Sequence, residues 1–238
     1  MNIAVIFAGG TGSRMNTKSR PKQFLELHGK PIIIYTLEKF ENHPLIDSIV
    51  VVCLKTWISF LNKLIKKYNF TKISSVISGG ETGQQSIYNG LCEVEKLYDT
   101  DSVVLIHDGV RPLIDEDTIT NNINCVLENG NAITVAPAIE TITLKENKNE
   151  VGKIIDRNKC QMAKAPQSFF LKDILVCHRR AQKDNYTEAI DSASLFSHYG
   201  HKLYTVIGSN ENIKITTPAD FFMFRAFMDA KENSQIFC

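Results

Sequence analysis

Residues 3–15 read IAVIFAGGTGSRM, and the chain soon continues with Pro21-Lys22-Gln23. An apolar run followed by glycines predicts a buried strand that ends in a tight loop. The glycines allow backbone N–H groups to close around oxyanions, and Arg14 and Lys22 add positive charge. The pattern matches neither the phosphate loop that ends in Gly-Lys-Ser/Thr nor the dinucleotide fingerprint G-x-G-x-x-G. Two glycines alone would fit a plain turn equally well, but together with the cations they indicate a polyphosphate site of a third kind.

The overall composition excludes two classes of partner. The 238 residues carry 27 Lys+Arg against 26 Asp+Glu, a net charge of +1. This balance creates no field that would attract nucleic acid or an anionic membrane. The length allows one large α/β domain or two small ones. Because no repeat, low-complexity tract or Ser/Gly linker interrupts the chain, we expect one domain over residues 1–238.

The cysteines and the first apolar run bear on the compartment. The six cysteines are scattered, with no CxxC pair and no histidine at metal-ligand spacing. Most lie in apolar segments, where free cysteine behaves as a small hydrophobe. The first apolar run is short and leads directly into the glycine loop, so it predicts neither a secretory signal nor a membrane span. We therefore expect a soluble protein of the reducing cytoplasm.

Apolar, β-rich runs alternate with helical patterns along the chain. The expected strands are Ile3–Phe7, Ile49–Leu54, Ser75–Ile77, Val103–His107, Ala132–Ala136, Leu203–Ile207 and Ile213–Thr216. The expected helices are Ile33–Phe40, Ile58–Tyr68, Ser86–Tyr98, Thr118–Leu127, Leu171–Gln182 and Pro218–Ala230. Continuous apolar runs are typical of strands covered on both faces. The alternation predicts an α/β fold with a mostly parallel sheet.

One stretch departs from this alternation. Ile139–Lys145 and Val151–Ile155 both have strand patterns, and the polar turn Glu146–Glu150 separates them. We interpret the stretch as a hairpin that projects from the sheet. Its apolar residues need a cover, which a second subunit would supply most simply. The alternative is an edge hairpin that lies on its own domain.

Asp108 follows the expected strand Val103–His107, within the motif IHDGVRP. Ligands of open α/β sheets bind beyond the carboxyl ends of the strands, so Asp108 should lie level with the glycine loop. A carboxylate there suits Mg²⁺, which prefers carboxylate and phosphate oxygens. The alternative is a residue that caps a turn. We expect His107 to pack or to form hydrogen bonds rather than to act as a base.

Three further positions have both a binding and a structural interpretation. Lys214 lies in a strand-like run and faces either solvent or a site. Gly79-Gly80 ends another strand shortly before Ser86, where glycines would admit a flat ring and the hydroxyl would read a base edge. Arg157, at the foot of the hairpin, pairs either with a phosphate or with a neighbouring acid.

Nearly the whole chain resembles the cytidylyltransferase family that includes 2-C-methyl-D-erythritol 4-phosphate cytidylyltransferase and ribitol-5-phosphate cytidylyltransferase. The motifs are AGGTGSRM, PKQF, SGGE followed by Ser86, IHDGVRP, Ala136-Pro137 with Thr141, IIDRN, APQSF, Ile190-Asp191-Ser192-Ala193-Ser194 and NIKITTPAD. The resemblance implies a three-layer, Rossmann-like nucleotidyltransferase of the glycosyltransferase-A type, with a hairpin arm at residues 139–157. It also implies a homodimer that uses Mg²⁺ to transfer CMP from CTP to a phosphorylated small alditol, with release of pyrophosphate.

The resemblance further implies roles for individual residues. The catalytic cations around the phosphates would be Arg14, Lys22 and Lys214. The nucleotide would be bound by Ala8, Gly9, Gly10, Thr11, Gly12, Gly80, Ser86 and Asp108. The acceptor would contact Asp108, Thr141, Arg157 and Asp191. Of these, Thr141 and Arg157 would reach the acceptor of the neighbouring subunit, and Asp108 would also hold Mg²⁺.

Two positions depart from the family pattern and leave the acceptor open. The family commonly has an arginine where this chain has Gly83, and TPQ where it has Ala165-Pro166-Gln167. We favour ribitol 5-phosphate or a related pentitol phosphate, giving a CDP-alditol for surface polymers. The alternative acceptor is 2-C-methyl-D-erythritol 4-phosphate, of isoprenoid precursor synthesis. Two other functions stay open. The chain could be a UTP- or GTP-dependent enzyme that acts on a hexose phosphate, or a non-catalytic nucleotide-binding protein.

Overall fold

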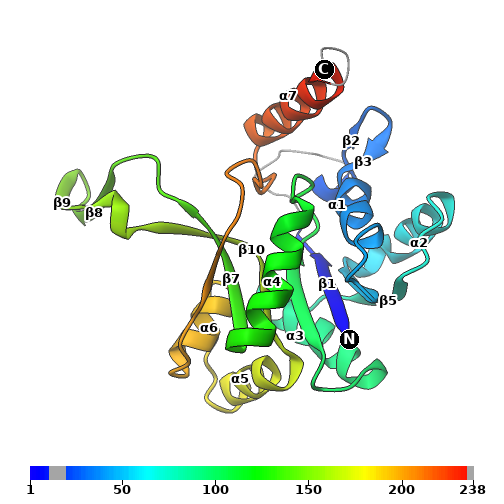
Figure 1. Cartoon of the computed structure of the whole chain (residues 1–238), viewed down its shortest axis with the longest axis horizontal. Helices are drawn as coiled ribbons and strands as arrows, with labels where there is room; N and C mark the ends of the chain where they lie inside the picture. The colour runs from blue at the N-terminus through cyan, green and yellow to red at the C-terminus, as the bar shows by residue number, and fades with distance from the viewer. Residues whose placement is uncertain (11–19, 235–238) are drawn as a thin grey trace.

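The computed structural model describes residues 1–10 and 20–234, and its centre is a seven-stranded sheet (Figure 1). The strand order is β11 (Thr205–Ile207), β7 (Asn131–Pro137), β10 (Gln161–Phe170), β6 (Val103–Asp108), β1 (Asn2–Ala8), β4 (Ser48–Cys53) and β5 (Ile73–Ser78). Neighbours pair in parallel, except that β10 is antiparallel to both β6 and β7. This confirms the predicted α/β fold with a mostly parallel sheet.

Helices cover the sheet on both faces. The helices are α1 (Ile32–Glu41), α2 (Ile58–Lys67), α3 (Gly83–Leu97), α4 (Glu116–Asn129), α5 (Leu171–Lys183), α6 (Ser192–His198) and α7 (Pro218–Ser234). Side chains alternate across a strand, so Ala4 and Ile6 of β1 share one core with α1, α2 and α4. Ile3 and Val5 share the other core with α3, α5 and α6. The sheet therefore forms the middle of three layers, which explains the continuous apolar runs.

Three short 3₁₀ helices and a small hairpin complete the body. They are η2 (Lys22–Phe24), η3 (Lys55–Trp57), η4 (Arg157–Lys159) and the pair β2 (Glu26–Leu27) and β3 (Lys30–Pro31). A third apolar cluster joins α7 to β2 and α1 through Phe224, Leu27 and Ile32. This cluster attaches the C-terminal helix beside the segment that follows the glycine loop.

The prediction of a strand at Ile213–Thr216 was wrong. The segment has no strand pairing; Ile215 N donates to Val110 O at 2.9 Å, and Thr216 N donates to the Asp220 carboxylate at 2.8 Å. Among the longer elements, the strand β10 and the helix α6 were not predicted. Gln161–Phe170 contains polar residues and Pro166, so its sequence lacks an apolar run. It becomes a central strand because β6 and β7 pair with it from both sides.

The predicted hairpin is present as β8 (Ile142–Asn147) and β9 (Glu150–Ile155), which project far from the body as an arm (Figure 1). Its exposed apolar side chains are Ile139, Leu144, Val151 and Ile154. Exposed apolar side chains on a projecting arm are of the kind that a protein partner covers. The interpretation that the arm lies on its own domain is therefore wrong.

Neither a membrane-spanning helix nor a disulfide occurs in the part of the chain that the structure describes. No helix there is both long and apolar enough to cross a bilayer. Cys53, Cys92, Cys125, Cys160 and Cys177 are all free thiols.

Candidate functional site

The glycine loop begins at the centre of the sheet, where β1 ends between β4 and β6. Gln23 is buried and donates from Nε2 to Ala8 O at 2.6 Å. A Cβ built on Gly10 would lie 3.8 Å from Lys22 Cε, so the lysine side chain lies against the glycine backbone. Ala8 and Gly10 therefore lie against the Pro21-Lys22-Gln23 segment.

Aromatic packing fixes the turn that carries Lys22. Phe24, at the end of η2, is fully buried. Its ring stacks on Trp57 at a centroid distance of 4.8 Å and meets Phe60 edge-on at 5.4 Å. This anchor leaves the backbone around Lys22 little freedom. The predicted site residues Thr11, Gly12 and Arg14 lie outside the described residues.

A second glycine turn, after β5, closes on Ser86. The Ser86 hydroxyl accepts from Gly80 N at 3.1 Å and donates to Thr82 O at 2.9 Å. A Cβ on Gly79 would lie 2.8 Å from Ser86 Oγ, and one on Gly9 would lie 3.6 Å away. Since real Cβ atoms essentially never approach within 3.0 Å, a larger residue at position 79 would force the Ser86 hydroxyl to move. The turn thus brings the Ser86 hydroxyl close to Gly9, at the end of β1.

Asp108, the last residue of β6, lies between two cations. Lys214 Nζ is 2.6 Å from its Oδ1, and Arg111 Nε is 2.8 Å from its Oδ2. The side chain is 7% exposed, and burial alone would raise the pKa of Asp108. Lys214 and then Arg111 more than offset this effect and hold that pKa below its usual value. Asp108 is therefore a carboxylate at neutral pH, and Lys214 points into the site rather than to solvent.

Arg111 is a site residue that the sequence analysis missed. Besides its bond to Asp108, it donates from one terminal nitrogen to Asn212 O at 2.8 Å, and so ties the β6 end to the segment that carries Lys214. The sequence feature that could have identified Arg111 is an arginine three residues after the carboxylate at the end of a strand. His107 is buried, contacts Arg111 O at 3.2 Å and packs on Phe40. Burial lowers the pKa of His107 to about 4, which confirms that it packs and forms a hydrogen bond.

A cavity of about 280 Å³ opens beside Asp108. Its lining comes from the ends of β1 and β6, the irregular part of β10, the starts of α3 and α6, and the loops that carry Arg111 and Lys214. The residues are Phe7, Gly83, Ile87, Ile106, Asp108, Arg111, Ala163, Lys164, Ala165, Gln167, Ile190, Asp191, Ser192 and Lys214. Gly83 and Ala165, the two departures from the family pattern, both line this cavity. The departures therefore bear on what the cavity accepts.

Asp191 forms part of the rim and is held by two amide groups. Gln167 Nε2 donates to its Oδ2 at 2.8 Å, and Ser194 N donates to its Oδ1 at 2.8 Å. The other end of the Gln167 side chain accepts from Ala193 N at 2.9 Å. These bonds fix the start of α6 against β10 and orient Asp191 at the cavity.

Thr141 and Arg157 are placed differently from the other predicted residues. Both are exposed at the base of the arm, and a terminal nitrogen of Arg157 donates to Ile139 O at 3.0 Å. Neither belongs to the described residues that line the cavity of their own chain. If they contact an acceptor, they reach the cavity of another subunit.

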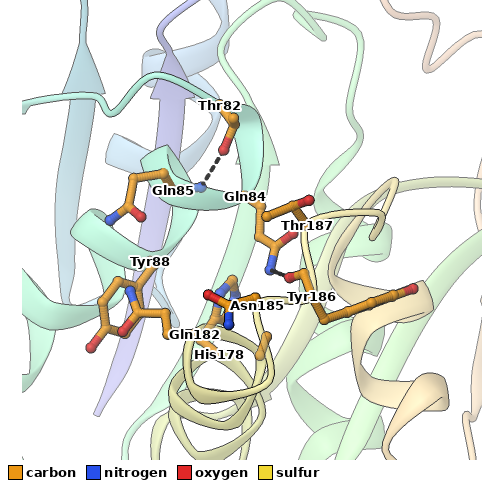
Figure 2. Close-up of a pocket in the computed structure, with 10 residues that line it drawn as sticks. Thr82, Gln84, Gln85, Tyr88, His178, Gln182, Asn185, Tyr186 and Thr187 are labelled. Carbon is orange, nitrogen blue, oxygen red and sulfur yellow. Dashed lines mark hydrogen bonds between the residues drawn. The ribbon is translucent and has the colours of Figure 1, made fainter.

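A second pocket, of about 210 Å³, lies between α3 and α5 (Figure 2). Apart from the methyl group of Ala181, its side chains are amides, hydroxyls and rings. The residues are Thr82, Gln84, Gln85, Tyr88, His178, Ala181, Gln182, Asn185, Tyr186 and Thr187. Burial lowers the pKa of His178 to about 4, so its ring is neutral. With no charge among these residues at neutral pH, the second pocket does not suit a phosphate ligand, whereas the first does.

In the first cavity, Asp108 is the carboxylate that could hold a magnesium ion together with phosphate oxygens. Mg²⁺ is commonly held by one or two carboxylates together with phosphate oxygens and water. Asp108 is ionised, buried and at a strand end, which meets this requirement. One three-residue group in the described chain, formed by His28, Asp229 and Glu232, also has metal-ligand spacing. It lies on the outer surface, where His28 contacts both acids at 3.3 and 3.6 Å.

Comparisons with known proteins agree with this geometry. The model of the 2-C-methyl-D-erythritol 4-phosphate cytidylyltransferase family matches residues 2–230. A ribitol-5-phosphate cytidylyltransferase of Vibrio parahaemolyticus is 56% identical, with 100% of each chain covered. A 2-C-methyl-D-erythritol 4-phosphate cytidylyltransferase of Clostridium acetobutylicum is 39% identical over 98% of this chain and 99% of that protein. The crystal structure of 4-diphosphocytidyl-2C-methyl-D-erythritol synthase from Anaerococcus prevotii superposes with a TM-score of 0.82 at 27% identity, covering 96% of both chains.

Proposed function

This chain belongs to the 2-C-methyl-D-erythritol 4-phosphate cytidylyltransferase family and is a cytidylyltransferase, and from that premise we propose that it transfers CMP from CTP to ribitol 5-phosphate. The observation that carries the choice of acceptor is the 56% identity, over the full length, to a protein named for ribitol 5-phosphate. The relative named for methylerythritol phosphate is 39% identical. Gly83 and Ala165, the two departures from the family pattern, line the cavity beside Asp108, where they would affect which acceptor fits.

In the proposed reaction, an oxygen of the acceptor phosphate attacks the α-phosphorus of CTP in line. The new O–P bond forms while the bond from the α-phosphorus to the bridging oxygen breaks, and pyrophosphate leaves with that electron pair. Such a reaction needs little covalent chemistry from the protein, so catalysis consists of positioning and charge neutralisation. Lys22 over the glycine loop, together with Arg14, would neutralise the charge on the leaving phosphates, and Lys214 would face the α-phosphate.

The nucleotide and the metal would meet at the end of β6. The glycine loop, Gly80 and Ser86 would hold the cytidine half, because the two glycine turns close on each other there. Asp108 would hold Mg²⁺, which when bound supplies positive charge to the phosphate oxygens. Binding of the metal to Asp108 would leave Lys214 and Arg111 to pair with phosphate oxygens instead.

Pyrophosphate release with a panel of substrates tests the proposed function. We expect kcat/KM for ribitol 5-phosphate to exceed that for 2-C-methyl-D-erythritol 4-phosphate, with CTP and Mg²⁺ present in both assays. A pocket that hydrogen-bonds a substrate hydroxyl rejects an analogue without it strongly, whereas an apolar pocket discriminates weakly. UTP and GTP in place of CTP serve as controls for the base. Faster turnover of the methylerythritol phosphate would contradict the proposed acceptor.

We also propose that the arm forms a homodimer and that Arg157 completes the acceptor site of the other subunit. Mixing Arg157→Ala with Lys22→Ala protein is expected to restore activity that neither variant has alone. A mixed dimer contains one site with both residues intact, because each site would draw them from different chains. Pyrophosphate release after subunit exchange measures the rescue. If labelled subunits exchange and activity stays at the level of the variants, Arg157 acts within its own chain.

A further inference from the structure

Lys164 lies where β10 departs from regular pairing. The ladder between β10 and β7 is interrupted between Ala163 and Gln167, and Lys164 lines the cavity at that interruption. Its Nζ donates to two backbone carbonyls, Asn210 O at 3.1 Å and Asn212 O at 3.2 Å. The ammonium is therefore fixed at the cavity wall rather than extended into solvent.

The charges around the cavity are not balanced. Three cations line it, Arg111, Lys164 and Lys214, against the two carboxylates Asp108 and Asp191. Asp108 is already paired with Arg111 and Lys214, and Asp191 caps the start of α6. Within residues 1–10 and 20–234, the ammonium of Lys164 has carbonyl oxygens as its hydrogen-bond partners and forms no ion pair. Carbonyl groups hold an ammonium in place without neutralising it.

A bound anion would stabilise the charged form of Lys164. Burial lowers the pKa of Lys164, and the neighbouring charge of Arg111 lowers it further. Both effects disfavour the charged form, and a nearby anion opposes both. An ammonium has three N–H donors, and the two carbonyls use two of them. One donor remains for a ligand.

The lining of the cavity indicates which substrate would supply that anion. It includes Asp108 and Lys214, where the two substrates would meet, and Ala165 and Asp191 on the acceptor side. Among the described residues, none of Ala8, Gly9, Gly10 or Ser86 belongs to it. Lys164 thus faces the acceptor half of the site rather than the nucleotide half.

We propose that Lys164 binds the phosphate group of the acceptor, holding the attacking phosphate beside Asp108 and Lys214. This assignment rests on the proposed function, since it takes the acceptor to be a phosphorylated alditol. It makes Lys164 a substrate-binding residue that selects alditol phosphates over uncharged alditols. The irregular part of β10 sets the position of Lys164, so the pattern of the sequence does not predict that this lysine binds the acceptor.

Three substitutions at this position separate charge from structure. Lys164→Gln retains N–H donors for the two carbonyls but removes the charge, Lys164→Met retains only the apolar stem, and Lys164→Arg retains the charge. We expect Lys164→Gln to raise KM for ribitol 5-phosphate by about tenfold to a hundredfold, as loss of a charged hydrogen bond predicts. KM for CTP should stay within about twofold, because Lys164 faces the acceptor half. Lys164→Arg should recover a substantial part of the acceptor affinity.

Lys63 is an exposed lysine of α2, and Lys63→Gln is the matched control. It should leave kcat and the KM values for ribitol 5-phosphate and CTP unchanged. The proposal is overturned if Lys164→Gln has the wild-type KM for the acceptor. It is also overturned if Lys164→Met alone impairs the enzyme, since the carbonyl contacts would then be the whole role of the lysine. Calorimetric titration with ribitol 5-phosphate separates this inference from the proposed function. A wild-type protein that binds the phosphate more tightly than Lys164→Gln, yet releases no pyrophosphate, would sustain the binding role and overturn the proposed reaction.

Discussion

Replacing Lys22 with alanine is expected to lower kcat about a hundredfold or more, with a smaller effect on KM for CTP. Negative charge moves onto the departing pyrophosphate in the transition state, and a positioned cation stabilises it there more than in the ground state. The Lys22 side chain lies against the glycine backbone, with its Cε 3.8 Å from a Cβ built on Gly10, and Phe24 next to its turn is stacked on Trp57. Steady-state measurement of pyrophosphate release at saturating CTP tests this expectation.

Lys55→Ala is the matched control for this substitution. Lys55 is exposed in η3, whose Trp57 stacks on Phe24 of η2, so it shares the local packing of the turn that carries Lys22. We expect it to retain wild-type kcat. A Lys22→Ala enzyme with wild-type kcat and only a raised KM would show that Lys22 binds substrate and transition state equally, which is incompatible with a catalytic role.

The part of the fold that the sequence predicts best is the part with the strongest periodicity. Ile3–Phe7 and Ile49–Leu54 are continuous apolar runs, and they became adjacent central strands because helices cover both faces of the sheet. Gln161–Phe170 has no such run, and its pairing between β6 and β7 is decided by contacts between distant segments. Ile213–Thr216 has strand-like residues, but it runs past the end of β6 and finds no pairing partner.

The residues of the candidate site likewise divide into those that local sequence signals predict and those whose role depends on contacts between distant segments. The glycine loop, Asp108 and Ser86 could be predicted because glycines and a strand-end carboxylate are local signals. Lys214 left two interpretations open, and its 2.6 Å contact with Asp108 depends on residues about a hundred positions apart. Arg111 and Lys164 were missed because a lysine or arginine in a loop or irregular strand is usually solvated. Their roles arise only when β6, β10 and the segment before α7 meet.

Asp108→Asn is expected to reduce activity sharply and to change how activity depends on Mg²⁺. The substitution keeps the shape of the side chain but removes the charge that would hold the metal. It also leaves Lys214 and Arg111 without their common counter-ion. We expect kcat to fall about a hundredfold at ordinary Mg²⁺, by analogy with the removal of other electrostatic groups, and to recover partly at high Mg²⁺. Titration of Mg²⁺ against pyrophosphate release measures both effects.

The same variant should also be less stable, and its stability should depend on pH differently. Removing one partner of a buried ion pair is costly, but Lys214 is 41% exposed and solvent reduces the loss to about 1–3 kcal/mol. The pKa of Asp108 is below its usual 3.8, so the carboxylate stabilises the fold above about that pH. This contribution is lost as the pH falls through the lowered pKa. The difference in Tm between the wild type and Asp108→Asn should therefore be large at pH 7 and shrink below pH 4.

These two measurements separate the possible roles of Asp108. A metal-binding carboxylate predicts a shift in the Mg²⁺ titration in addition to the lower Tm. A residue that only anchors Lys214 and Arg111 predicts the lower Tm with an unchanged half-saturating Mg²⁺ concentration. Glu116→Gln at the start of α4, in which an exposed acid is neutralised, should leave the Mg²⁺ titration unchanged and lower Tm only slightly, since an acid in the first turn of a helix contributes less than about 1 kcal/mol. An unchanged titration for Asp108→Asn would place the metal on other groups, while the pairing of Asp108 with Lys214 would still account for the lost stability.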